Sequence, residues 1–307
     1  AKDAISTVIF GQDRVIENTL VTILSGGHAL LIGVPGLAKT KLVETLGITL
    51  GLDAKRIQFT PDLMPSDILG AEVLDESNSG KRSFRFISGP VFAQLLMADE
   101  INRASPRTQS ALLQAMQEQH ITVAGARHDL PKPFHVLATQ NPLEQEGTYP
   151  LPEAQLDRFL MKVALGYPDA ADENAMLVRF ERDDPLDTLA AVVGPDDILA
   201  MQSDVRRVRV EESVRQYVVD VCRATRLHDD ILLGASPRAT LALYRVCQAR
   251  AAIAGRDFVI PDDVKAMSAH VLTHRLVVNP QTRLRGRTPE DVVGEVVNTV
   301  RVPVEAM

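Results

Sequence analysis

Residues 29–40 read ALLIGVPGLAKT, a short apolar run followed by a loop with two glycines that ends in lysine and threonine. Apolar residues return at helical spacing from Leu42 to Leu50, so the order is strand, glycine loop, helix. The loop fits the phosphate-binding pattern G-x-x-x-x-G-K-[ST], with Ala38 in place of the second glycine. Because such a loop turns backbone N–H groups toward phosphate oxygens, this stretch predicts a nucleotide site.

Each residue of the loop has a predicted task. The glycines permit the bend, Lys39 reaches the terminal phosphates and the Thr40 hydroxyl binds magnesium. We expect Ala38 to be tolerated, because one added methyl fits where the backbone does not adopt a left-handed conformation. A chance surface loop is disfavoured by the strand before it and the helix after it. The predicted nucleotide-binding residues of the loop are Gly33, Val34, Pro35, Gly36, Leu37, Ala38, Lys39 and Thr40.

The residues that follow continue an alternation of strands and helices. Apolar runs predict strands at 56–60, 95–98, 135–139 and 159–165, with helical segments between them, such as 106–118. This alternation is typical of an α/β fold with a parallel sheet and helices on both faces. Two segments with turn residues near their centres interrupt it and predict inserted hairpins, at about 71–88 and 120–130.

Beyond residue 168 the strand patterns stop. Helical spacing and proline-containing starts predict helices over 170–182, 195–204, 211–228, 237–254, 262–275 and 289–300. We therefore expect two domains. An α/β core over residues 1–167 would carry the two hairpins, and a smaller all-α domain would cover residues 168–307.

Polar residues follow two of the predicted strands. Asp99 and Glu100 come after the apolar run 95–98, and Asn141 follows the run 135–139. At the carboxyl edge of a sheet, Asp99 can hold the magnesium water shell, Glu100 can polarise an attacking water and Asn141 can position that water. The alternatives are a solvated acidic turn for the carboxylates and an Asn-Pro turn for Asn141, and such a turn is compatible with the functional role.

Composition narrows the classes of protein. The 307 residues include 33 Lys and Arg against 40 Asp and Glu, a net charge of −7, so a general basic field is lacking and nucleic-acid binding is disfavoured. Two cysteines, Cys222 and Cys247, predict reduced core thiols in a cytoplasmic protein. The longest strongly apolar stretch, residues 29–34, falls far short of the roughly 20 residues that cross a bilayer, so no membrane segment is expected.

Five motifs resemble those of the AAA+ ATPases and, within them, the MoxR group. They occur in the family's order and cover nearly the whole chain: GVPGLAKT at 33–40, ADEINRA at 98–104, ATQNP at 138–142, LDRF at 156–159 and SPR at 236–238. The alanine of the loop is itself similar to the MoxR form. The resemblance implies a P-loop NTPase domain followed by a helical lid, with ATP and Mg²⁺ as cofactors and ATP hydrolysis as the reaction.

The resemblance also implies roles for motif residues. Lys39 and Thr40 match Walker A, Asp99 and Glu100 match Walker B, and Asn141 matches sensor 1. The hairpins look like the helix-2 insert and the pre-sensor-1 insert.

Two arginines and an N-terminal pair complete the implied site. Arg158 matches the arginine finger that reaches the nucleotide of a neighbouring subunit, with Arg103 as a rival, and Arg238 matches sensor 2. Gly11 and Gln12 look like the segment that lines the adenine pocket. A hydrolase of this type needs at least one such arginine, which contributes roughly 10³ to 10⁵ in rate.

The family's usual form is a homo-oligomeric ring, commonly hexameric. Its usual role is chaperone-like remodelling of client proteins or cofactor and metal insertion, often beside a von Willebrand factor A domain partner. Two other functions stay open. A DNA-associated motor would need basic hairpins, whereas the first hairpin sets Lys81, Arg82 and Arg85 against Glu72, Asp75 and Glu76. A nucleotide-regulated scaffold would bind ATP without turnover, and Glu100 and Asn141 argue against that.

Some basic residues also have simpler interpretations. Arg158 reads as a surface partner of Asp157, and Arg238 as a solvated residue of a first helical turn. His270 and His274 lie four apart on a predicted helix but lack the glutamate and third ligand of a zinc site. We expect these histidines to lie on the helix surface.

Overall fold

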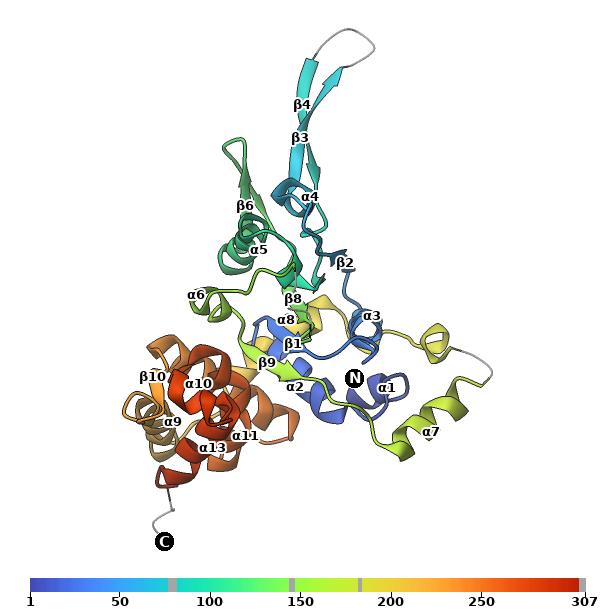
Figure 1. Cartoon of the computed structure of the whole chain (residues 1–307). Helices are drawn as coiled ribbons and strands as arrows, with labels where there is room; N and C mark the ends of the chain where they lie inside the picture. Colours follow the sequence, from blue (N-terminus) through green and yellow to red (C-terminus); the bar gives the residue numbers. More distant parts are fainter. Residues whose placement is uncertain (77–81, 144–146, 182–183, 304–307) are drawn as a thin grey trace. The chain divides into compact units, whose positions relative to one another are not determined.

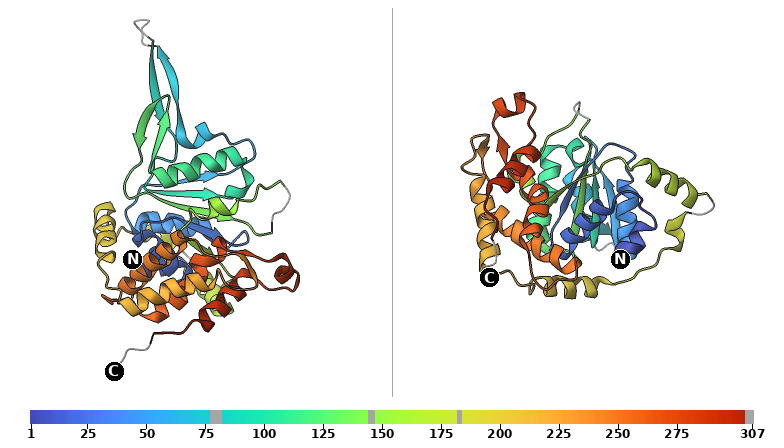
Figure 2. Two further views of the ribbon diagram at one scale, coloured as in Figure 1. Left: turned by 90° about the vertical axis from the view of Figure 1, so that its left-hand side faces the viewer. Right: turned by 90° about the horizontal axis from the view of Figure 1, so that it is seen from below.

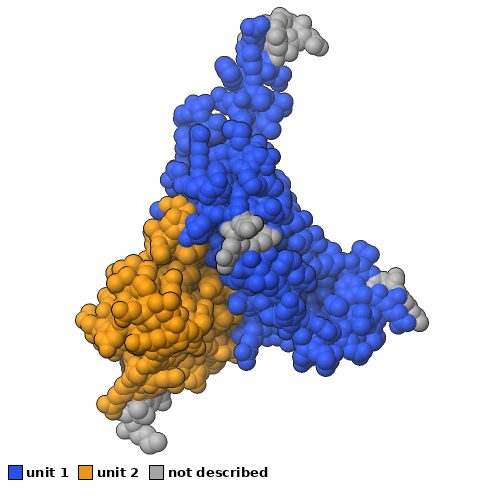
Figure 3. All heavy atoms as spheres, in the orientation of Figure 1, with its two compact units in different colours: residues 1–17, 28–151, 164–199 blue, residues 18–27, 152–163, 200–307 orange. Residues whose placement is uncertain are grey.

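The computed structural model describes residues 1–76, 82–143, 147–181 and 184–303. The chain forms two compact units, which Figure 3 colours separately. Unit 1 comprises residues 1–17, 28–151 and 164–199, and unit 2 comprises residues 18–27, 152–163 and 200–307. Within the described ranges, no helix is both long and apolar enough to cross a membrane.

A five-stranded sheet lies at the centre of the α/β fold (Figure 1). Its strand order is β2-β5-β8-β1-β9, and the β2/β5, β5/β8 and β8/β1 pairs are parallel. The strands are β1 (Ala29–Ile32), β2 (Ala54–Gln58), β5 (Leu95–Asp99), β8 (His135–Gln140) and β9 (Met161–Ala164). Every residue of β5 is buried, as expected for a strand covered on both faces. The predicted α/β fold with a parallel sheet is confirmed.

Helices and short 3₁₀ turns precede, connect and follow these strands. Their bounds are α1 (Lys2–Ser6), α2 (Asp13–Leu24), α3 (Lys39–Thr49), α4 (Pro65–Leu69), η1 (Ile101–Arg103), α5 (Pro106–Glu118), α6 (Glu153–Leu156), α7 (Ala170–Arg179), η2 (Pro185–Thr188) and α8 (Pro195–Val205). α5 begins at a Ser-Pro pair, where the Ser105 hydroxyl accepts from the Thr108 N–H and so caps the first turn.

Both predicted hairpins are present and project from unit 1 on the side of α4 and α5 (Figures 1 and 2). β3 (Gly70–Glu76) pairs antiparallel with β4 (Arg82–Ser88), and β6 (His120–Val123) pairs antiparallel with β7 (Ala126–Asp129). The hairpins touch each other where Phe86 stacks on His128, with ring centroids 4.0 Å apart. Lys81, counted in the charge balance of the first hairpin, lies outside the described residues.

Unit 2 is mainly helical, with α9 (Glu212–Ala224), α10 (Pro237–Ile253), α11 (Pro261–Leu272), η3 (Thr273–Arg275), α12 (Pro280–Leu284) and α13 (Pro289–Thr299). The expectation that strands stop near residue 168 is wrong. β10 (Ile231–Leu233) and β11 (Val277–Val278) form a small antiparallel sheet. Runs of two and three residues are too short for any period to appear in the sequence.

The compact units also differ from a single division at residue 168. Residues 164–199 belong to unit 1, where Lys41 of α3 pairs with Asp184 at 2.5 Å. Residues 152–163 belong to unit 2, where the Asp157 carboxylate pairs with Arg275 at 2.7 Å. Each of these two segments therefore forms a long-range ion pair within its own unit, and neither assignment follows from the order of residues in the chain. The functional boundary of the lid stays a prediction.

The two cysteines lie in the core of unit 2, as expected. Cys222 of α9 and Cys247 of α10 are buried free thiols. Burial raises the pKa of both thiols, so they remain protonated at neutral pH and act as small apolar side chains.

Candidate active site

The glycine loop lies between β1 and α3, as predicted, but its backbone conformation differs from expectation at Ala38. This residue has φ +54° and ψ +24°, in the left-handed region, so the prediction that it avoids that conformation is wrong. Gly36 also has a positive φ, +87°. A loop that curls around a phosphate needs such reversals to aim successive N–H groups inward. In a non-glycine residue the left-handed conformation costs about 1–2 kcal/mol.

Lys39 and the start of the loop are tied to the sheet. The Lys39 ammonium donates to the Gly33 carbonyl oxygen at 2.5 Å, which holds the lysine across the loop. The Gly33 N–H donates to the carbonyl oxygen of Gln140, at the end of β8. Thr40, in the first turn of α3, is half-buried. The predicted phosphate-binding groups therefore lie at the carboxyl edge of the sheet, next to the residue that precedes Asn141.

Asp99 is buried and has partners on both neighbouring strands. Its Oδ2 accepts from the Arg56 Nη2 at 2.6 Å and Nε at 3.2 Å, and its Oδ1 accepts from the Thr139 hydroxyl at 2.6 Å. The same Thr139 oxygen accepts the Glu100 N–H at 2.9 Å. One hydroxyl on β8 therefore contacts both the Asp99 carboxylate and the backbone of Glu100.

Glu100 is oriented by side chains from two other elements. Its Oε2 accepts from the Gln58 amide at 2.7 Å and from the Arg103 guanidinium at 2.9 Å. The residue itself has φ +54°. A strained, non-glycine backbone with a constrained carboxylate is typical of a residue held for function. Arg103, the rival candidate for an arginine finger, thus contacts Glu100 of its own chain.

Asn141 follows β8 and is buried. Its Oδ1 accepts from the Leu143 N–H at 3.1 Å, which is the Asn-Pro turn that the sequence predicted. Since Gln140 is paired with Ile32 in the β1/β8 register, Asn141 stands beside the start of the glycine loop. The three strand ends that carry the loop, the acidic pair and the asparagine are therefore neighbours in the sheet.

An apolar cavity of about 310 Å³ adjoins the glycine loop within unit 1. Its lining comes from the N-terminal segment, from the loop and α3, and from α7: Val8, Ile9, Phe10, Gln12, Gly36, Leu37, Ala38, Lys41, Pro168, Asp172, Met176 and Phe180. Cavities of this size and lining suit a flat heteroaromatic ring. Its position beside the predicted phosphate loop is the one that a nucleotide base requires.

Gly11 and Gln12 occupy one wall of this region. The Gln12 amide donates to the Gly166 carbonyl oxygen at 2.7 Å, so it holds the N-terminal segment against the chain that leads into α7. Gly11 has φ +65°, and an added Cβ would lie 2.7 Å from Pro168 Cβ and from Asp172 Oδ2. Only glycine fits this close approach without strain.

Arg158 and Arg238 both lie in unit 2. Asp157 pairs with Arg275 at 2.7 Å and with Arg238 at 3.6 Å, so the simpler interpretation of Arg158 as a surface partner of Asp157 is wrong. The Arg158 side chain is half-buried, and among the described residues it has no hydrogen-bond or ion-pair partner. The side chain of Arg238, in the first turn of α10, is 54% exposed and is held by Asp157.

The histidine pair also differs from expectation. His274 is buried in η3, and its Nε2 lies 3.0 Å from the Phe159 carbonyl oxygen. Burial, followed by repulsion from Arg275, holds its pKa well below the usual range. His270 is half-buried beside Asn18. The prediction that both histidines lie on the helix surface is wrong, because helical spacing does not reveal that the 157–160 turn packs against His274 at the end of α11.

Known proteins are similar to this chain. Residues 28–161 match the family described as "ATPase family associated with various cellular activities (AAA)", and residues 223–296 match the AAA lid domain. The chain is 42% identical to Chaperone MoxR1 of Mycobacterium tuberculosis, over 97% of this chain and 80% of that protein. It is 31% identical to Protein MoxR of Paracoccus denitrificans, over 91% and 88% respectively. This chain belongs to the MoxR family of AAA+ ATPases.

A solved structure extends the MoxR-family likeness to three dimensions. A protein of Cytophaga hutchinsonii that is assigned as an ATPase superposes with a TM-score of 0.90 at 40% identity, covering 98% of this chain and 93% of that one. The expected AAA+ core followed by a lid is therefore shown for this chain.

Four polar residues that contact residues of the five motifs were missed by sequence reasoning. They are Arg56, Gln58, Thr139 and Arg275. A weak signal existed for the first two, because polar residues at 56 and 58 point to one face of a strand. Nothing local marks Thr139 or Arg275, whose partners lie 40 and 118 residues away.

Proposed function

We propose that this chain binds Mg·ATP at the carboxyl edge of the sheet and hydrolyses it to ADP and phosphate. The main support is that the Thr139 hydroxyl contacts both the Asp99 carboxylate and the Glu100 N–H, on a strand that pairs with β1, the strand before the glycine loop. Two acidic side chains with different partners can take different tasks. Asp99 would hold the metal, and Glu100 would polarise the attacking water.

The oxygen atoms at this edge of the sheet fit a bound magnesium ion, which would compete with Arg56 for the Asp99 carboxylate. Mg²⁺ prefers oxygen ligands, and the Asp99 carboxylate with the Thr40 hydroxyl supplies them, directly or through water. When bound, the ion would neutralise charge on the phosphates. Loop N–H groups and Lys39 would bind the phosphates, the apolar cavity would take the adenine, and Asn141 would orient the water.

Two substitutions test this assignment of roles. In Lys39→Ala, tight ATP binding is expected to be lost, because the phosphates lose the cation of the loop. In Glu100→Gln, binding is expected to persist while hydrolysis falls at least about 100-fold, because an amide cannot act as a base. Calorimetry and phosphate release measure the two effects separately. Near wild-type affinity in the first variant, or turnover within a few fold in the second, would contradict the assignment.

We further propose that Arg158 acts on the nucleotide of a neighbouring subunit in a homo-oligomeric ring, expected to be hexameric. Arg158 lacks a partner among the described residues of its own chain, whereas Arg103 already contacts Glu100. Arg238 would contact the phosphates as the lid arginine. An arginine directed at another subunit gains its partner only on assembly.

Mixing two inactive variants tests action between chains. Arg158→Ala keeps its phosphate loop, and Lys39→Ala keeps its arginine. Mixed rings then contain some complete interfaces, and partial ATPase activity is expected to return. If mixed oligomers form but activity does not return, Arg158 acts within its own chain or only in the fold, and Arg103→Ala is the next variant to test.

For the biological role we propose chaperone-like remodelling or cofactor insertion on a protein client. The relative from Mycobacterium tuberculosis is named a chaperone, which supports this class. A von Willebrand factor A domain protein is the expected partner, and a cytoplasmic location is expected. Co-purification from the native host, with an Lys39→Ala control, would identify the client. Salt-sensitive DNA binding that stimulates the ATPase would instead favour the DNA motor.

A further inference from the structure

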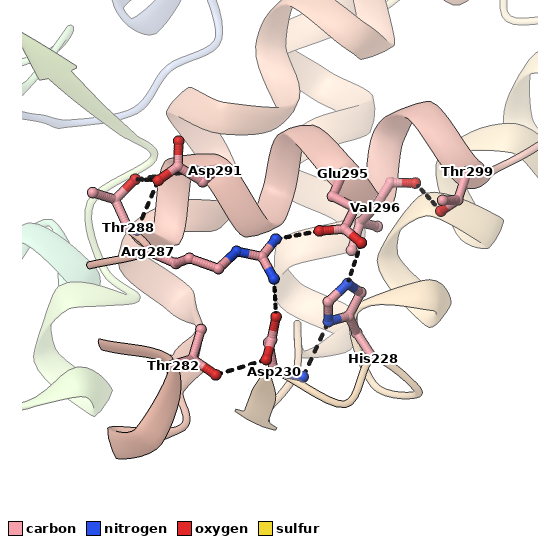
Figure 4. Close-up of polar contacts among 9 residues, drawn as sticks. All are labelled: His228, Asp230, Thr282, Arg287, Thr288, Asp291, Glu295, Val296 and Thr299. Atoms are coloured by element: carbon pink, nitrogen blue, oxygen red, sulfur yellow. Dashed lines mark hydrogen bonds and ion pairs between the residues drawn. The ribbon is translucent and has the colours of Figure 1, made fainter. Parts of the chain in front are cut away.

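Two polar clusters of unit 2 are candidates for a further role apart from the predicted nucleotide contacts. The first joins His228, Asp230, Arg287 and Glu295 (Figure 4). Its histidine and two carboxylates offer ligand atoms within 4.8 Å of one another. Arg287, however, pairs with both carboxylates and supplies the charge that a cation would bring. This cluster ties α13 to the β10 region and carries no site.

The second cluster centres on Arg275, whose side chain is only 3% exposed. Its Nε donates to Asp157 Oδ1 at 2.7 Å. Its two terminal nitrogens donate to four carbonyl oxygens, those of Asp157 (3.3 Å), Phe159 (2.7 Å), Leu160 (3.1 Å) and Val271 (2.5 Å). A guanidinium has five N–H groups, so this one is fully used. Three of the four carbonyls belong to the turn that contains Arg158.

His274 adds a second hold on the same turn. Its lowered pKa keeps the ring neutral at pH 7, so the Nε2–H donates to the Phe159 carbonyl oxygen at 3.0 Å. That oxygen also accepts from Arg275. The backbone is therefore held on both sides of Arg158, at Asp157 and at Phe159, by contacts that do not involve the Arg158 side chain.

Asp157 links this turn to the second arginine of the site. Its Oδ1 accepts from the buried Arg275, and its Oδ2 lies 3.6 Å from Nη1 of Arg238 on α10. One carboxylate thus lies between a fixed arginine and a half-exposed one. A displacement of the turn would move Arg158 and would also release the anchor of Arg238.

We propose that Arg275 is a positioning residue for ATP hydrolysis: it fixes the Asp157–Leu160 turn so that Arg158 reaches the neighbouring subunit's nucleotide, and through Asp157 it couples Arg158 to Arg238. This inference rests on the proposed action of Arg158 between subunits. Arg275 itself touches no nucleotide. A misplacement of about 1 Å in a group that contacts the reacting phosphate can reduce the rate about 100-fold.

Arg275→Lys tests the proposal, because lysine keeps the charge but cannot make five planar contacts. We expect kcat per subunit to fall 10- to 100-fold, with the nucleotide Kd within threefold of wild type. Arg256→Lys is the matched control: Arg256 also pairs with a buried carboxylate of unit 2, that of Asp263, but far along the chain from the turn. It is expected to keep kcat within twofold. An equal loss of kcat in both variants would overturn the proposal.

Mixing experiments separate positioning from a general structural role. Arg275→Lys mixed with Lys39→Ala should regain part of the activity, because the second protein supplies a well-placed Arg158 to the intact loop of the first, whose own Arg238 stays without its anchor. Arg275→Lys mixed with Arg158→Ala should regain none, because neither supplies a well-placed arginine. Absence of recovery in the first mixture, despite mixed oligomers, overturns the proposal.

A second variant covers the case in which Arg275→Lys does not fold. Asp157→Asn keeps the shape and the backbone acceptor and removes only the charge that Arg275 and Arg238 share, and it should show the same mixing pattern. Normal turnover in a folded Asp157→Asn would overturn the proposal. If Arg158→Ala itself retains activity, the proposed function of Arg158 has failed, and this result is distinct from failure at Arg275 alone.

Discussion

Thr139→Val is expected to damage both the stability of unit 1 and its turnover. The Thr139 side chain is completely buried, and valine has nearly the same shape, so the substitution removes the hydroxyl without leaving a cavity. The Glu100 N–H loses its acceptor, and the Asp99 carboxylate loses one of its donors. Leaving the Glu100 N–H unpaired, and the Asp99 carboxylate with Arg56 as its remaining partner, should lower the free energy of unfolding by about 3 to 5 kcal/mol.

Thr49→Val provides a matched control within the same unit. Thr49 is also completely buried, but its hydroxyl has no hydrogen-bond partner in the part of the chain that the structure describes. The same chemical change should therefore alter the free energy of unfolding by less than about 1 kcal/mol, or raise it. Thr139→Ser, which keeps the hydroxyl and loses one methyl, should cost only about 1 kcal/mol.

Urea denaturation of the three variants, with phosphate release at saturating ATP, measures both effects. Turnover should fall in Thr139→Val, because Glu100 loses the contact that fixes its backbone, and should largely persist in Thr139→Ser. If Thr139→Val and Thr49→Val are destabilised equally, the hydroxyl bridge between Asp99 and Glu100 does not contribute as argued. Unchanged turnover in a folded Thr139→Val would show that the activity of Glu100 does not depend on the Thr139 hydroxyl.

Two further perturbations follow from backbone strain and from buried histidine. Ala38→Gly should raise the free energy of unfolding by up to about 1 kcal/mol, because glycine relieves the strain of the left-handed conformation. Ala38→Val should lower it by at least about 1 kcal/mol. Thermal denaturation measures both effects, and equal midpoints for the two variants would show that the backbone at residue 38 is not strained. Burial, followed by the nearby His135, lowers the pKa of His28 to about 3. Below the unfolded value near 6.5, only the unfolded chain takes up the proton, so the contribution to stability is fully present above pH 6.5 and the free energy of unfolding should fall by about 2 kcal/mol from pH 7 to pH 5. His28→Gln should reduce this loss, and urea titrations at each pH would measure it.

The sequence by itself determined the glycine loop, the order of strands and helices around the central sheet, and both hairpins. These features depend on neighbouring residues: apolar spacing that repeats every two or 3.6 positions, and glycines placed where the chain must turn. It also placed Asp99, Glu100 and Asn141 at strand ends. Because parallel strands end at one edge of a sheet, local position was enough to bring them near the loop.

Only the tertiary structure decided which side chains hold those residues and which positions are buried. Arg56 and Thr139 reach Asp99 from strands 43 and 40 residues away, and Arg275 reaches Asp157 across 118 residues. Such pairs depend on strand order and on how helices pack, and single-residue patterns record neither. His274 has the helical spacing of a surface residue, but the turn that covers it removes it from water. Burial is a property of what packs against a residue, and for that reason it appears only once the chain has folded.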